Sequence, residues 1–330
     1  MHHYIKNIFL AVVTSLLVLS CSNEFELTQA GQDIPVVYGM ISVGDTATYI
    51  RVEKAFVDEN TSAYVLSKDP GQLYFSDINV KLRHVKTNKD FTLTRVDGNL
   101  EGYKRDEGAF ADAPNYLYKI KKSALTFIPK DEYKLIISKT DGAVLTEATT
   151  TALLPYANED IVSPGASALL SFVNNLDYKF RWFGDEKSVI HDVVMTIFYT
   201  EEKAGTVLRK SITWPIARNI DKTEYTIKGR AFFDFMAGAL DKDPNIKRFF
   251  QSASFAVISG GQEVKEYISI GQANLGITSS GEIPVYTNLS NDARGLFSSR
   301  TAFERINIGL AQGTLDSLKN GSITRSLNFK

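Results

Sequence analysis

Residues 49–56 read Tyr-Ile-Arg-Val-Glu-Lys-Ala-Phe, and residues 78–83 read Ile-Asn-Val-Lys-Leu-Arg. In both stretches apolar side chains alternate with polar ones, which is the two-residue period of a strand with one buried face. Asp97-Gly98 and Asp141-Gly142 predict tight hairpin turns in the same region. Strand patterns of this kind recur at 36–42, 91–96, 117–121, 133–138 and 144–151. Short strands at regular spacing predict an immunoglobulin-like or related β-sandwich over residues 34–155.

A change in pattern after Leu154-Pro155 indicates a second unit. Residues 158–165 are mostly polar and include Pro164 and Gly165, so we expect the joint there. Gly260-Gly261 is interpreted as a hairpin turn. Strand patterns resume at 178–183, 192–200, 206–214, 253–259 and 264–270.

One helix is predicted inside the second unit, near 230–240. Its apolar residues follow the 3.6-residue period of a helix that packs one stripe against a sheet; they are Ala231, Phe232, Phe235, Met236, Ala239 and Leu240. Core packing is favoured over an aromatic box for a ligand, and Trp182 and Trp214 pose the same choice between sandwich core and carbohydrate stacking. The predicted fold is mostly β: the N-terminal sandwich, then a second β-rich domain over 166–330 with one or two helices.

The composition is that of a globular protein with little net charge. The 330 residues are 44% hydrophobic, and 37 basic and 38 acidic side chains leave a formal charge of -1. A chain of this size buries a substantial core, and a near-neutral one has no long-range field to attract nucleic acid. Nucleic-acid binding is therefore disfavoured.

The first twenty residues have the order of a secretory signal. Lys6 precedes an apolar stretch at 8–19, which is shorter than the roughly 20 residues that a membrane-spanning helix needs. The residues at its end, Val18-Leu19-Ser20-Cys21, resemble the lipobox of bacterial lipoproteins. We expect cleavage between Ser20 and Cys21, which removes residues 1–20. The alternative is an ordinary buried thiol at the end of an uncleaved helix.

Cys21 is the expected lipidation site, because it is the only cysteine and its thiol can accept diacylglycerol. Several acyl chains, palmitate among them, would give stable anchoring where one chain binds only marginally. Residues 21–33 are mostly polar and predict a flexible tether. Ser22 rather than Asp follows the cysteine, and by resemblance to Gram-negative sorting rules this favours the outer membrane. Whether the body faces the periplasm or the cell surface stays open.

No pattern of catalytic residues stands out. His2 and His3 belong to the signal segment, and His84 and His191 lie on unrelated strand patterns, so no zinc-binding spacing is formed. Neither a Gly-x-Ser-x-Gly elbow nor a phosphate-binding loop occurs. Carboxylate pairs such as Glu201-Glu202 are typical of solvated surface. We predict no catalytic residue, no cofactor and no enzymatic activity.

The segment Asp241-Lys242-Asp243-Pro244-Asn245 alternates oxygen donors as the first half of a calcium loop does. Ile246 stands where such a loop has its turn glycine, and Ser252 where it has a bidentate Glu. A turn that ends the preceding helix is the favoured interpretation. We therefore predict no metal site and keep Asp241, Asp243 and Asn245 as the alternative.

The chain also resembles a large family of Bacteroidota lipoproteins catalogued as domain of unknown function 4249. The resemblance rests on residues 34–41, which read Ile-Pro-Val-Val-Tyr-Gly-Met-Ile, on residues 49–56, and on further matches at 69–75, 148–150, 286–289 and 295–300. Gly71 and the stretch 292–294 depart from it. The matching residues are apolar, aromatic and turn residues, so the resemblance implies a scaffold and no reaction.

What the resemblance implies is a lipidated envelope protein, often encoded beside outer-membrane receptors. The expected function is a non-catalytic binding or accessory module on the outer membrane, associated with a TonB-dependent nutrient receptor. Its ligand, whether a small molecule, a glycan or a peptide, stays open. The alternatives are a structural or adhesive cell-surface protein and, least favoured, a hydrolase.

Overall fold

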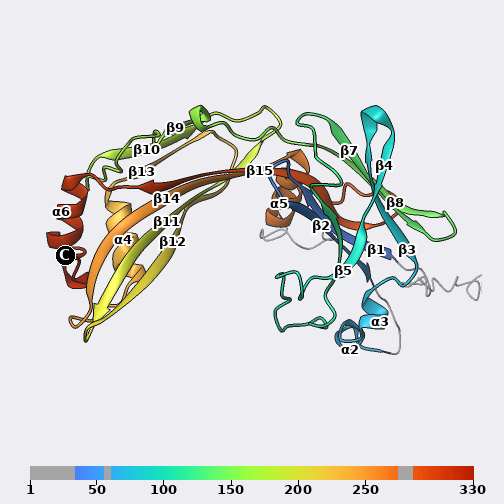
Figure 1. The fold of residues 1–330 in the computed structure, drawn as a ribbon, viewed down its shortest axis with the longest axis horizontal. Helices are drawn as coiled ribbons and strands as arrows, with labels where there is room; N and C mark the ends of the chain where they lie inside the picture. Colours follow the sequence, from blue (N-terminus) through green and yellow to red (C-terminus); the bar gives the residue numbers. More distant parts are fainter. Residues whose placement is uncertain (1–33, 56–60, 274–284) are drawn as a thin grey trace, which may run out of the picture.

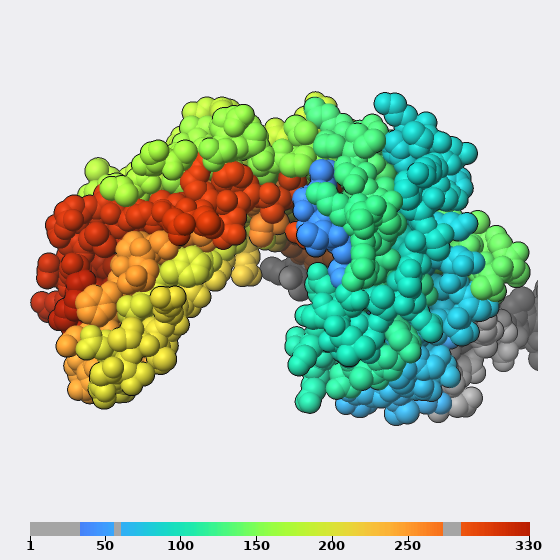
Figure 2. Space-filling view, viewed as in Figure 1, coloured from blue at the N-terminus to red at the C-terminus, as the bar shows by residue number. Residues whose placement is uncertain are grey.

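The computed structural model describes residues 34–55, 61–273 and 285–330. The predicted signal segment, the tether and the expected lipidation site at Cys21 lie outside these residues. Figure 1 shows two β-rich units joined into an arch, and the space-filling view in Figure 2 shows a wide notch between them. The prediction of a mostly β chain is confirmed, since most of the described elements are strands.

The strands are β1 (Ile34–Ile41), β2 (Ala47–Ala55), β3 (Ile78–His84), β4 (Lys89–Thr92), β5 (Thr94–Asp97), β6 (Tyr116–Lys121), β7 (Glu132–Lys139), β8 (Val144–Thr151), β9 (Ile161–Ser163), β10 (Asp177–Trp182), β11 (Ile190–Lys203), β12 (Thr206–Ile220), β13 (Glu224–Lys228), β14 (Lys247–Gly260) and β15 (Arg294–Ile308). The helices are α2 (Ala63–Ser67), α3 (Pro70–Leu73), α4 (Arg230–Ala239), α5 (Gln262–Ala273) and α6 (Gln312–Asn320), with short 3-10 turns at Val85–Thr87, Asn158–Asp160 and Arg325–Leu327.

The N-terminal unit is the expected sandwich. One layer has the strand order β4-β3-β7-β8, and the other is the β15-β1-β2-β6-β5 part of an eight-stranded sheet. Their alternating apolar side chains meet in one core, where Val37, Ile50, Val80 and Leu135 are fully buried. The predicted hairpin at Asp141-Gly142 connects β7 to β8, and Gly142 supplies the positive φ of 95° that this turn requires.

The eight-stranded sheet runs through both units in the order β12-β11-β14-β15-β1-β2-β6-β5. Strand β15 makes the connection. Its first half pairs in parallel with β1, from Arg294 opposite Val36 to Ser299 opposite Ile41. Its second half pairs antiparallel with β14, from Arg300 opposite Gly260 to Ile308 opposite Ala253.

The second core lies between two sheets and α4. The β12-β11-β14-β15 strands face the small sheet β13-β10-β9. Helix α4 lies where the sequence predicts it, and its Phe232, Phe233 and Met236 are buried with Phe180 of β10 and Phe255 of β14. Most of the predicted stripe packs in the core, but Ala239 is exposed, and Phe233, which the stripe did not include, is buried.

The two cores do not follow the predicted division into residues 34–155 and 166–330. Leu289, Ala293 and Phe297 belong to the core of the N-terminal sandwich, although they lie within the range 166–330. Parallel pairing of β1 with β15 is the reason, since it returns the C-terminal part of the chain to the first unit. The C-terminal range therefore contributes to both cores.

Two local predictions for the second unit are wrong. Residues 264–270 belong to helix α5, and Gly260-Gly261 is the passage from β14 into that helix, without a hairpin. The apolar residues of this segment fit the period of a strand or that of a helix, so tertiary contacts decide which of the two forms. Glu263 in the first helical turn accepts a hydrogen bond from Ser298 Oγ at 2.7 Å, and this contact is made from a helix lying across β15.

Two predictions for the first unit also differ. The segment 91–96 divides at Leu93 into β4 and β5, which belong to different sheets. Asp97-Gly98 opens a long connection to β6 instead of a tight hairpin. Asp97 Oδ1 accepts hydrogen bonds from the backbone N–H groups of Asn99 and Asn115, so the Asp closes a loop at both ends.

Candidate binding face on the second unit

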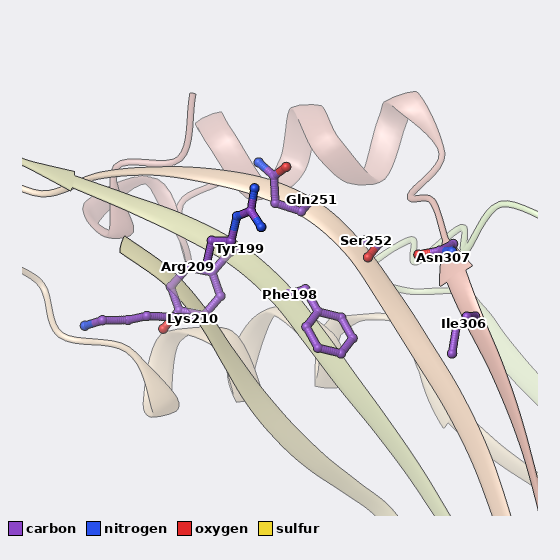
Figure 3. A pocket seen from close by; sticks show the side chains of 8 residues that line it. All are labelled: Phe198, Tyr199, Arg209, Lys210, Gln251, Ser252, Ile306 and Asn307. Carbon is purple, nitrogen blue, oxygen red and sulfur yellow. The ribbon is translucent and has the colours of Figure 1, made fainter. Parts of the chain in front are cut away.

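None of the described elements covers one face of the β12-β11-β14-β15 sheet. Along β11, Met195 and Ile197 point into the core, and the alternate residues Thr196 and Phe198 point the other way. We call this second side, made by the outward residues of these four strands, the open face. Phe198, Ile258 and Ile306 leave 38%, 41% and 63% of their surfaces exposed on it. In Figure 3 the helices lie behind the sheet and the open face is toward the reader.

A hollow of about 450 Å³ lies on the open face. Residues of all four strands line it, so it runs across the strand direction (Figure 3). Its lining residues are Phe198 and Tyr199 of β11, Arg209 and Lys210 of β12, Gln251 and Ser252 of β14, and Ile306 and Asn307 of β15.

Two irregularities of the strand ladder coincide with the hollow. On β14, Ser252 is opposite Phe198 and Phe250 is opposite Tyr199, so Gln251 is an extra residue. On β15, Ile308 is opposite Ala253 and Arg305 is opposite Phe255, which leaves one extra residue at 306–307. Adjacent bulges bend both strands and redirect their side chains, a device that is common beside functional sites.

Asn307 takes up the second bulge with a φ of 59°. Asn is one of the few residues with a side chain that adopts this left-handed conformation readily. Sequence alone could not place the bulges, because a change of register leaves no mark on a period-two pattern until the partner strand is known.

The polar groups of the hollow are of two kinds. The side chains of Arg209, Ser252 and Asn307 make no hydrogen bond or ion pair with any other described residue. Lys210 is bound instead, since its Nζ lies 2.5 Å from Glu201 Oε2. Arg209 is thus the lining cation whose charge is available to a ligand.

The floor beneath Lys210 is a buried ion network. Arg248 Nε donates to Glu201 Oε1 at 2.9 Å, and its NH1 donates to Leu327 O at 2.8 Å. Burial acts to raise the pKa of Glu201, but hydrogen bonds from Lys210 and Arg248 outweigh it, so the pKa lies below its ordinary value. This network fixes β11 and β14 to the C-terminal segment.

The tryptophans considered for carbohydrate stacking are core residues. Trp182 is fully buried, and Trp214 stacks on Phe235 of α4 with ring centroids 5.3 Å apart. The exposed aromatic ring of the hollow is that of Phe198, which the strand pattern over 192–200 includes without distinguishing it. Its exposure follows from which face of β11 the second core covers.

The turn at Asp241, Asp243 and Asn245 is closed by its own hydrogen bonds. Asp243 Oδ1 accepts from the backbone and side-chain nitrogens of Asn245, at 2.9 and 3.1 Å, and Oδ2 accepts from Lys203 Nζ at 2.8 Å. The Lys203 hydrogen bond, with those of Asn245, holds the pKa of Asp243 below its ordinary value. Within the described ranges no three His, Cys, Asp or Glu side chains gather as metal ligands.

A hydroxyl and imidazole chain lies in the joint between the units. Ser259 Oγ is 2.6 Å from both His191 Nδ1 and Tyr156 OH. Burial lowers the pKa of His191 to about 4 and raises that of Tyr156 to about 12, so both are neutral near pH 7. A serine beside an imidazole is the arrangement of a nucleophile, but Ser259 is only 1% exposed. These hydrogen bonds tie Tyr156 to β11 and β14.

The comparisons with known proteins identify no family. No protein family and no curated protein matches the chain. Among solved structures, chicken CNTN1 FN1-FN3 domains are 10% identical with a TM-score of 0.18, over 83% of this chain and 65% of that one. Chicken interferon gamma receptor alpha chain is 8% identical with a TM-score of 0.17, over 69% and 89%. A bacterial ice-binding adhesin is 10% identical with a TM-score of 0.16, over 85% and 66%. The fold is therefore assigned from the sheets themselves.

None of the described helices has the length and apolar character to cross a bilayer.

Proposed function

We propose that the protein is a lipoprotein of the outer membrane, held by lipid on Cys21, and that it acts as a non-catalytic binding module through its open face. The observation that carries the proposal is the uncovered sheet of the second unit, with Phe198, Ile258 and Ile306 exposed on it. Phe198 and Ile306 line one hollow, and exposed apolar side chains beside a hollow are more typical of an interaction surface than of plain solvent-facing strand.

The shape of the molecule supports this proposal. The eight-stranded sheet is continuous through β15, so the open face is held in a defined position relative to the N-terminal sandwich (Figure 1). Rigid elements present binding residues more accurately than loops do. A tether at the N-terminal end of the sandwich would leave the second unit free to meet a partner.

The partner that we propose is an outer-membrane protein, in keeping with the resemblance to lipoproteins encoded beside TonB-dependent nutrient receptors. Two molecules confined to one membrane meet at a raised effective concentration. A modest interface on the open face would therefore be sufficient for association.

The test is site-specific photo-cross-linking in intact cells. A photoreactive residue replaces Ile258 or Ile306 on the open face, and Leu176, which is 61% exposed and lies outside it, serves as the control position. We expect one outer-membrane protein to be recovered from the first two positions and not from the third. Recovery from all three positions alike, or from none, would count against the open face. Recovery of extracellular matrix or of another cell's protein would favour an adhesive function.

A further inference from the structure

We propose that the hollow on the open face binds an acidic saccharide, with a sugar ring against Phe198 and a carboxylate at Arg209. The inference rests on the proposed function and names a ligand class for the same face. It is carried by the side chains of the hollow, most of which have unused hydrogen-bonding capacity or exposed apolar surface.

The apolar part of the hollow suits a flat ligand. Phe198 of β11 presents a ring that is 38% exposed, and Ile306 of β15, on the far side of β14, leaves 63% of its surface exposed. Both lie on the open face, and the hollow crosses the strands (Figure 3). A pyranose ring has one flat face of C–H groups that packs on an aromatic ring. A bulky apolar ligand would need a deeper enclosure.

The polar part suits a ligand rich in hydroxyl groups. Ser252 offers a hydroxyl, and Gln251 and Asn307 offer amides, each of which both donates and accepts hydrogen bonds. Sugar hydroxyls also donate and accept, so they match these groups in either direction. Ser252 and Asn307 have no protein partner to release before they bind, among the residues that the structure describes.

The charge of the hollow favours a ligand that carries an acidic group. None of its eight lining residues is acidic, and the charge of Lys210 is already met by Glu201. Arg209 of β12 remains, and its guanidinium has no hydrogen bond or ion pair with a described residue. A guanidinium binds a carboxylate through two parallel hydrogen bonds, which gives geometric selectivity as well as affinity.

The experiment titrates the full chain in detergent with matched sugars. The acidic probes are trimers of galacturonate, glucuronate and mannuronate, and each is compared by calorimetry with the neutral trimer of the corresponding hexose. We expect at least one uronate trimer to bind about tenfold more tightly than its neutral counterpart. Arg209→Gln should abolish that difference, and Phe198→Ala should weaken binding of both members of the pair.

Matched variants separate the site from general effects. Phe198→Tyr keeps the ring and should retain binding. Arg218→Gln removes an exposed cation elsewhere on β12, and Phe183→Ala removes an exposed ring outside the hollow; neither should alter binding. Phe198 points away from the core, so thermal unfolding of the Phe198 variants should match that of the parent.

Three results would overturn the proposal. These are no binding of any uronate trimer, binding that is insensitive to both Phe198→Ala and Arg209→Gln, and equal or tighter binding of triglutamate at the same residues, which would reassign the hollow to an acidic peptide. If sugar binding fails while the cross-link from Ile258 or Ile306 persists, the saccharide proposal is overturned and the proposed function stands. If both fail, the open face has no binding function.

Discussion

Arg248 of β14 and Glu201 of β11 form a buried ion pair, with Nε 2.9 Å from Oε1 and side chains that are 1% and 8% exposed. The pair is completed by Lys210, which contacts the second carboxylate oxygen, and by Leu327 O, which accepts from the same guanidinium. Each charge is thus compensated only while the others stay in place, and Lys210, which lines the hollow, connects the network to it.

Removing one partner of this pair should strongly destabilise the protein. Arg248→Met leaves Glu201 buried with Lys210 as its one remaining counter-charge among the described residues, and loss of one member of a buried pair costs about 3–5 kcal/mol. The free energy of unfolding from urea denaturation measures the change. Lys179→Met, which breaks the exposed pair with Glu224, is the control and should cost about 0–1 kcal/mol. Equal losses from the two variants would show that burial of the network has no energetic weight.

His191 should make the protein less stable in mild acid. Its pKa is lowered by burial to about 4, against an ordinary value of 6.5, so between these limits the unfolded chain binds a proton that the folded one does not. The contribution is full above pH 6.5 and is lost as the pH falls toward 4, by up to about 3 kcal/mol. Urea unfolding at pH 7 and at pH 4.5 measures it. His191→Gln should reduce the loss between the two pH values, and an unchanged loss would assign the acid sensitivity to other groups.

Gly295 should be essential to the junction between the units. It has a φ of 108°, and an added Cβ would lie 1.9 Å from Val37 O on the neighbouring strand β1. Gly295→Ala must therefore push β1 and β15 apart. We expect a loss of stability well above the roughly 1–2 kcal/mol that an unfavourable φ costs alone.

Gly142→Ala is the matched control for Gly295→Ala. Gly142 has a similar φ of 95°, but an added Cβ there meets nothing within 4 Å. The loss of stability from Gly142→Ala should therefore stay near the roughly 1–2 kcal/mol that an unfavourable φ costs alone. Melting temperatures of the two variants decide the matter: equal shifts would mean that the close approach at Val37 relaxes without cost.

Cys21 should carry the anchor. Cys21→Ala is expected to abolish labelling by a fatty-acid analogue and to move the protein out of the membrane fraction, because no other cysteine can accept the lipid. Cys21→Ser retains size and polarity without a thiol and should behave alike. Labelling that persists in both variants would exclude lipidation at this position.

The sequence by itself determined the local structure of most strands and of one helix. Alternation at 78–83 and at 133–138 gave β3 and β7, and the apolar stripe at 230–240 gave α4, because the side-chain period of a short segment is set by its own backbone geometry. The turn at Asp243 was likewise local, since Asn245 closes it from two residues away.

Only the tertiary structure decided what depends on partners distant in the sequence. The parallel pairing of β1 with β15 joins segments more than 250 residues apart and makes one sheet of two units. The same pairing and its neighbours decide that α5 is a helix, that Ser259 is buried, and that Phe198 faces outward. Each strand pattern has two faces that look equivalent in sequence, and which face stays exposed depends on which one the other described elements cover.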